Sequence, residues 1–75
     1  MKIEILGSGC AKCKKLYENT VEGVKLSGKE AEVVKVEDIT AIASYGVMST
    51  PAVVVDGVVK SSGKLLSPEE IKALL

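Results

Sequence analysis

Two cysteines, Cys10 and Cys13, stand where the sequence changes from a strand pattern to a helix pattern. Residues 2–6 alternate between polar and apolar side chains, as a half-buried strand does, and a Gly-Ser-Gly turn follows. From Cys10 onward, apolar residues recur three and four positions apart, which places them on one face of a helix. The Cys-Ala-Lys-Cys motif therefore predicts two thiols at a strand-to-helix junction.

Turn and capping signals divide the rest of the chain into further elements. The first helix is expected to end near Gly28; the later strands are expected at residues 31–36, 52–55 and 58–60, and the later helices at 38–45 and 68–75. Asp56-Gly57 predicts a tight hairpin, and residues 67–70 read as a capping box with Pro at the first helical position. The order βαβαββα predicts one α/β domain over residues 1–75, with a four-stranded mixed sheet flanked by three helices.

The charge balance and the length exclude several functions. Ten Lys residues and ten acidic residues give a net charge of zero, whereas nucleic-acid binding relies on an excess of cations. No apolar run approaches the roughly 20 residues that a membrane span needs, and the first six residues are too short and too charged for a signal peptide. We therefore expect a cytoplasmic protein, in which cysteines stay reduced unless they cycle in catalysis or bind metal.

The position of the motif favours redox chemistry. A helix N-terminus carries partial positive charge and unpaired N–H groups, which stabilise a thiolate, and Lys12 adds a cation. Cys10 stands at the exposed end of the expected helix and Cys13 faces inward one turn later. Cys10 is thus predicted to be the nucleophile and Cys13 the resolving thiol, and their redox-active disulfide is expected to work without a cofactor or a metal.

Other interpretations of the two cysteines remain open. The Gly-containing loop and CxxC also resemble those of heavy-metal-associated domains, and two thiolates suit Cu(I), so a soft-metal carrier is an alternative. A non-catalytic binding adaptor is another. A disulfide staple closing four residues would contribute only about 2 kcal/mol by chain entropy. One helix is expected after the second strand and another at the end of the chain. This order of elements differs from that of heavy-metal-associated domains.

Taken with Thr50-Pro51 and the hairpin that follows, the motif resembles the thioredoxin/glutaredoxin fold. The likeness is greatest to the short redox-active disulfide proteins of archaea and bacteria, and it spans nearly the whole chain. The resemblance implies a monomeric protein-disulfide reductase in electron transport. Its partners would be a disulfide-containing protein substrate and an upstream disulfide reductase. It also implies that Pro51 is cis and that the Thr50 backbone pairs with an extended substrate.

The resemblance also singles out Glu4 and marks some departures. Glu4 precedes Cys10 by six residues, the spacing at which thioredoxins carry a buried carboxylate that relays protons. Glu4 is therefore a candidate relay and Lys12 a candidate for tuning the thiolate, although an exposed Glu4 beside Lys2 is the other interpretation. The chain has no Trp before the motif and lacks the glutaredoxin segment that helps hold glutathione. Met48 and Val47 are expected to line a substrate groove or to pack in the core.

Overall fold

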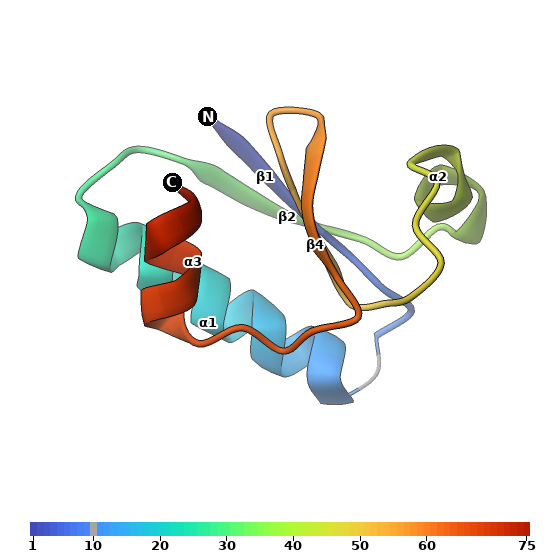
Figure 1. Cartoon of the computed structure of the whole chain (residues 1–75), viewed down its shortest axis with the longest axis horizontal. Helices are drawn as coiled ribbons and strands as arrows, with labels where there is room; N and C mark the ends of the chain where they lie inside the picture. The colour runs from blue at the N-terminus through green and yellow to red at the C-terminus, as the bar shows by residue number, and fades with distance from the viewer. Residues whose placement is uncertain (10) are drawn as a thin grey trace.

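The computed structural model describes residues 1–9 and 11–75, and within them the elements follow the expected order (Figure 1). The strands are β1 (Lys2–Leu6), β2 (Glu32–Val36), β3 (Ala52–Val55) and β4 (Val58–Ser62), and the helices are α1 (Ala11–Ser27), α2 (Ile39–Ser44) and α3 (Pro68–Leu74). The last strand runs two residues further than the sequence pattern indicated. None of the helices in this described part has the length and apolar character that a membrane span requires.

The strands form a mixed sheet in the order β2-β1-β3-β4, which confirms the predicted fold class. β1 runs parallel to β2 and antiparallel to β3, with Leu6 opposite both Val36 and Ala52. The end of β1, the end of β2 and the start of β3 therefore lie at one edge of the sheet. The chain reaches the cysteine motif, residue 37 and Pro51 from these three points, so the fold itself brings them together.

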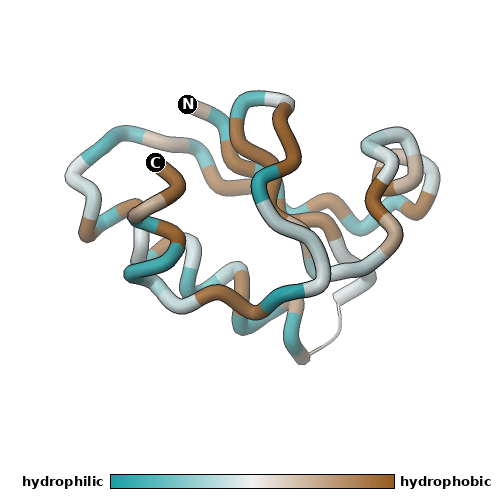
Figure 2. Tube along the Cα trace, viewed as in Figure 1, coloured by the Kyte–Doolittle hydropathy of each residue, from teal (hydrophilic) through white to brown (hydrophobic). Residues whose placement is uncertain are grey.

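Each face of the sheet carries its own apolar cluster because side chains alternate along a strand. Ile3 and Ile5 face α1 and α3, whereas Leu6 faces α2. Figure 2 shows hydrophobic residues running through the central strands. β3 is buried along its whole length, as expected for a central strand covered on both faces. Each fully buried aliphatic side chain contributes about 1.5–3 kcal/mol, so the two clusters supply most of the stabilisation available to so short a chain.

The local signals in the sequence act where they were expected. Asp56 and Gly57 both have positive φ, at 49° and 84°, as a type I′ hairpin turn requires. The Asp38 carboxylate accepts a hydrogen bond from the Thr40 backbone N–H at 3.0 Å and caps α2. Ser67 forms the predicted reciprocal capping box at the start of α3. These contacts set where the short elements begin and turn.

One close contact between helices was not evident from the sequence pattern. α1 and α3 lie side by side in Figure 1, and Gly23 of α1 faces Ile71 of α3. A Cβ atom at Gly23 would lie 2.7 Å from Ile71 Cβ and 2.8 Å from the carbonyl oxygen of Pro68. The absence of a side chain at Gly23 therefore allows the two helices to approach this closely.

We predict that Gly23→Ala lowers the free energy of unfolding. Ala favours a helix over Gly by about 1 kcal/mol, but overpacking against Ile71 typically costs about 1–3 kcal/mol. Urea denaturation measures the outcome, with Glu22→Ala as the control because Glu22 is exposed on the same helix. A Gly23→Ala protein more stable than the parent would contradict the close contact.

Candidate active site

Cys13, Gly7 and Pro51 pack against one another at the edge of the sheet. Cys13 lies in the first turn of α1 and is 6% exposed. A Cβ atom at Gly7 would lie only 2.3 Å from Cys13 Sγ and 3.9 Å from Pro51 Cα. Gly7 is therefore the position at which the backbone comes close to both the thiol and the proline, and no larger residue fits there without displacing the sulfur.

Backbone hydrogen bonds hold the segments of this junction in place. The Gly7 N–H donates to the carbonyl oxygen of Val36 at 3.0 Å, which ties the loop after β1 to the end of β2. The Gly63 N–H donates to the carbonyl oxygen of Pro51 at 2.8 Å, which ties the start of β3 to the chain after β4. The Thr50–Pro51 peptide bond is cis, and Pro51 is buried. The surroundings of the Cys13 thiol are thus anchored on both sides.

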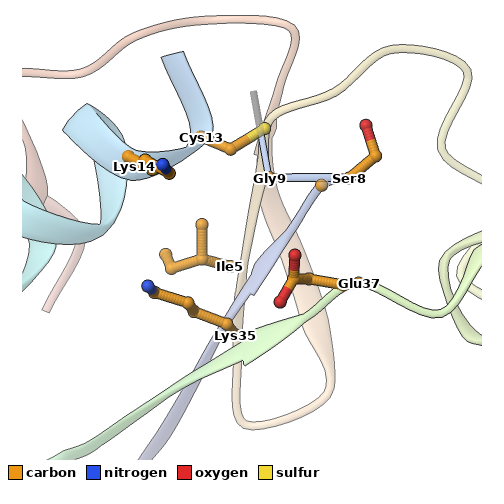
Figure 3. Close-up of a pocket in the computed structure, with 8 residues that line it drawn as sticks. Ile5, Ser8, Gly9, Cys13, Lys14, Lys35 and Glu37 are labelled. Atoms are coloured by element: carbon orange, nitrogen blue, oxygen red, sulfur yellow. The ribbon is translucent and has the colours of Figure 1, made fainter. Parts of the chain in front are cut away.

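A polar pocket of about 350 Å³ opens beside Cys13 (Figure 3). It is lined by Ile5, Gly7, Ser8, Gly9, Cys13, Lys14, Lys35 and Glu37. The Glu37 side chain extends into it from the end of β2, and Glu37 Oε2 lies 2.8 Å from where a Cβ atom of Gly9 would be. Gly9 has φ 87°, so both its conformation and its contact with Glu37 favour glycine. The Lys35 ammonium lies 4.7 Å from the centre of the Tyr17 ring.

A second, more apolar pocket of about 320 Å³ lies on the α2 side of the loop. Its lining residues are Ser8, Ile39, Ile42, Ala43, Val47, Met48 and Thr50. Met48 is 97% exposed and Ile39 is 76% exposed, which is high for large apolar side chains. The structure therefore places Met48 at a groove, whereas half-buried Val47 lines the groove and also packs against the core cluster around Leu6. Ser8 lines both pockets, so the polar and the apolar pocket meet at the loop before the motif.

Glu4 is on the opposite side of the sheet from this polar pocket. It alternates with Ile3 and Ile5, which pack toward α1, and it does not line the pocket beside Cys13. Glu4 is half-buried, and its Oε2 accepts a hydrogen bond of 2.7 Å from the Tyr45 hydroxyl. This hydrogen bond, together with burial and the carboxylate charge, raises the pKa of Tyr45 above its usual 10.0.

The other predicted site residues are placed as follows. Thr50 is exposed beside the buried Pro51, and Lys12 is exposed in the first turn of α1 and lines neither pocket. Cys10, the predicted nucleophile, lies outside the described residues. Within the described part of the chain, no group of three or more His, Cys, Asp or Glu side chains is placed to hold a metal ion.

Lys35 and Glu37 are site residues that the sequence interpretation missed. Both side chains share a face with Ile5, because β2 is parallel to β1 and Lys35 is opposite Ile5. Two sequence features could have indicated them: parallel neighbouring strands end at the same edge of a sheet, and side chains alternate between its faces. To combine these features, one needs the register of β1 and β2, which the sequence alone does not define.

Comparisons with known proteins agree with this architecture. The family model described as a thioredoxin domain matches residues 1–75. A thioredoxin of Methanothermobacter thermautotrophicus is 43% identical over 75 residues, covering 100% of this chain and 97% of that protein. A thioredoxin of Methanocaldococcus jannaschii is 47% identical over 70 residues, covering 93% of this chain and 80% of that protein.

We predict that Gly7→Ala lowers stability by about 1–3 kcal/mol, the usual cost of forcing an extra methyl group into a packed site. The penalty should be smaller in a Cys13→Ala background, because the sulfur that the new methyl group would meet is then absent. Denaturant unfolding of the four proteins gives this coupling directly. Equal penalties in the two backgrounds would show that Gly7 and the thiol do not share the space.

We also predict that Glu4 sets the titration of Tyr45. In a Tyr17→Phe protein, Tyr45 is the one remaining tyrosine, and its ultraviolet absorbance reports ionisation. Glu4→Gln should lower the pKa of Tyr45, because the carboxylate charge and the strongest acceptor are removed. Because the pKa of Tyr45 is raised in the folded state, its hydrogen bond to Glu4 stabilises the fold below pH 10.0. This contribution to the free energy of unfolding is lost as the pH rises through the pKa of folded Tyr45. An unchanged pKa would show that the hydrogen bond does not persist in solution.

Proposed function

The chain belongs to the thioredoxin domain family, and we propose that it reduces protein disulfides through Cys10 and Cys13. Thioredoxin relatives along its length support thiol–disulfide oxidoreductase chemistry. The observation that carries the finer proposal is the placement of Cys13. Its side chain is buried in the first turn of α1, close to Gly7. In the sequence, Cys10 stands three residues earlier, directly before the helix.

In the proposed cycle, the Cys10 thiolate attacks one sulfur of a substrate disulfide. A bond forms between Cys10 Sγ and that sulfur, the substrate S–S bond breaks, and the other substrate sulfur leaves as a thiolate. Cys13 then loses its proton and attacks Cys10 Sγ. The mixed disulfide breaks, the second substrate sulfur leaves, and the Cys10–Cys13 disulfide holds the two electron equivalents of oxidation. An upstream disulfide reductase would return this disulfide to the dithiol.

The division of roles follows from where the two cysteines stand relative to α1. In the sequence Cys10 directly precedes Ala11, the first residue of a 17-residue helix, and the N-terminus of a helix favours a thiolate. Lys12 and Lys14 are exposed in the same turn and add positive charge. Cys13 has little contact with solvent and suits an intramolecular attack better than the capture of a large substrate.

The apolar pocket beside Thr50 supports a protein substrate. Exposed Ile39 and Met48 would contact apolar side chains next to the target disulfide. The Thr50 backbone would pair with the extended substrate chain, in the manner of an added β-strand. We propose that the chain acts as a monomer in the cytoplasm and that its reductase uses this same surface.

We predict that Cys13→Ser traps a protein substrate as a mixed disulfide on Cys10, because the resolving thiol is gone. Cys10→Ser is the matched control and should give no such adduct. Mass spectrometry of the reaction with a disulfide-containing protein, quenched by alkylation, identifies the attached cysteine. Trapping through Cys13 in the Cys10→Ser protein would reverse the assigned roles. Tight stoichiometric Cu(I) binding without any disulfide exchange would instead support the metal-carrier alternative.

A further inference from the structure

The polar pocket contains a carboxylate that the proposed cycle has not yet used. We propose that Glu37 accepts the proton of the Cys13 thiol during the resolving step and passes it to the departing substrate sulfur. This inference rests on the proposed function, since it assigns a residue to one step of that cycle. It places the proton acceptor directly after β2, at a position different from Glu4.

Cys13 and Glu37 lie at the same pocket. Both line the pocket of about 350 Å³, and Figure 3 shows their side chains entering it from α1 and from the end of β2. The sulfur lies against Gly7, and the carboxylate lies against Gly9, the residue immediately before Cys10 in the chain. A proton that leaves Cys13 therefore has a carboxylate acceptor on the lining of the same pocket.

Positively charged side chains line the same pocket as the Glu37 carboxylate. Lys14 of α1 and Lys35 of β2 are the other charged side chains that line this pocket in the described part of the chain. The Lys35 ammonium lies over the Tyr17 ring, a contact that favours a fixed cation. The two lysines that line the pocket would stabilise a thiolate on Cys13 during the resolving step.

Glu4 is the other carboxylate that the sequence suggested as a proton acceptor. Glu4 faces the α2 side of the sheet, where its Oε2 already accepts the Tyr45 hydroxyl at 2.7 Å. Ile5, the next residue in β1, points into the pocket with Cys13 instead. Because neighbouring residues of a strand face opposite sides, the backbone of β1 separates Glu4 from this pocket.

The proposed step balances in atoms and charge. The Cys13 S–H bond breaks and its proton moves to the Glu37 carboxylate. The new thiolate attacks Cys10 Sγ, so that the Cys10–Cys13 bond forms as the bond from Cys10 to the substrate sulfur breaks. The substrate leaves as a thiolate, takes the proton from the Glu37 carboxylic acid and departs as a thiol. Glu37 is again a carboxylate, and no further oxidant or reductant takes part.

Stopped-flow reaction of the reduced protein with 5,5′-dithiobis(2-nitrobenzoate) separates the two thiols. Attack by Cys10 releases a first coloured thiolate, and attack by Cys13 on the mixed disulfide releases a second. Glu37→Gln should slow the second phase by about tenfold to 100-fold at neutral pH, around the lower end of what a positioned general base supplies. The first phase should change by less than about threefold, because a surface charge acts on it only through screened electrostatics.

The pH profile distinguishes proton transfer from a structural effect. In Glu37→Gln, the second phase should rise in proportion to hydroxide, about tenfold per pH unit, because only solvent then removes the proton. The parent should vary less steeply around neutral pH, and Glu37→Asp should recover part of the rate. Glu32→Gln is the matched control, since Glu32 is exposed like Glu37 but lies at the far end of β2, away from the pocket.

Each outcome bears on the inference. An unchanged second phase in Glu37→Gln would overturn it, and a slowed second phase in Glu4→Gln alone would assign the transfer to Glu4. Both results would leave the oxidoreductase proposal intact, because two phases would still be present. Absence of a second phase in the parent would show that Cys13 does not resolve, and the oxidoreductase proposal and this inference would then fail together.

Discussion

The close approach of the Cys13 sulfur to the backbone at Gly7 is the contact on which the site depends. It requires glycine, because a Cβ atom there would lie 2.3 Å from Cys13 Sγ. It also requires α1 to begin directly above the end of β1, which the packing of α1 on Ile3 and Ile5 ensures. The hydrogen bond from Gly7 to Val36 then fixes the loop against β2. The packing of the core therefore determines where the Cys13 thiol lies.

The same loop separates two environments with different chemistry. On one side, the groove beside Thr50 exposes apolar side chains, as binding of a polypeptide requires. On the other side, the pocket lined by Glu37 and two lysines is polar. Because Ser8 lines both, the proposed substrate site and the proposed proton acceptor lie on either side of the motif. A small domain can thus combine binding and chemistry at a single edge of its sheet.

The sequence predicted those features that local chemistry determines. The Asp56-Gly57 turn, the Asp38 cap and the Ser67 capping box depend on a few neighbouring residues, and all three form as expected. The order of elements followed from the periodicity of apolar residues, and the family from the motif together with Thr50-Pro51. The contact of Gly23 with α3, the partner of Glu4 and the location of Glu37 depend on strand register and helix packing between distant segments. No local pattern encodes those, which is why Glu4 stood out in the sequence and Glu37 did not.

The most direct test of the central claim is an equilibrium redox titration of the intact chain. Samples equilibrated in dithiothreitol buffers of graded potential are quenched with an alkylating reagent and weighed by mass spectrometry. We expect one transition between a dithiol and an intramolecular Cys10–Cys13 disulfide. The ratio of dithiol to disulfide should change tenfold for about every 30 mV, as for any two-electron couple. Oxidation that yields only disulfide-linked dimers, or cysteines that titrate separately, would contradict it.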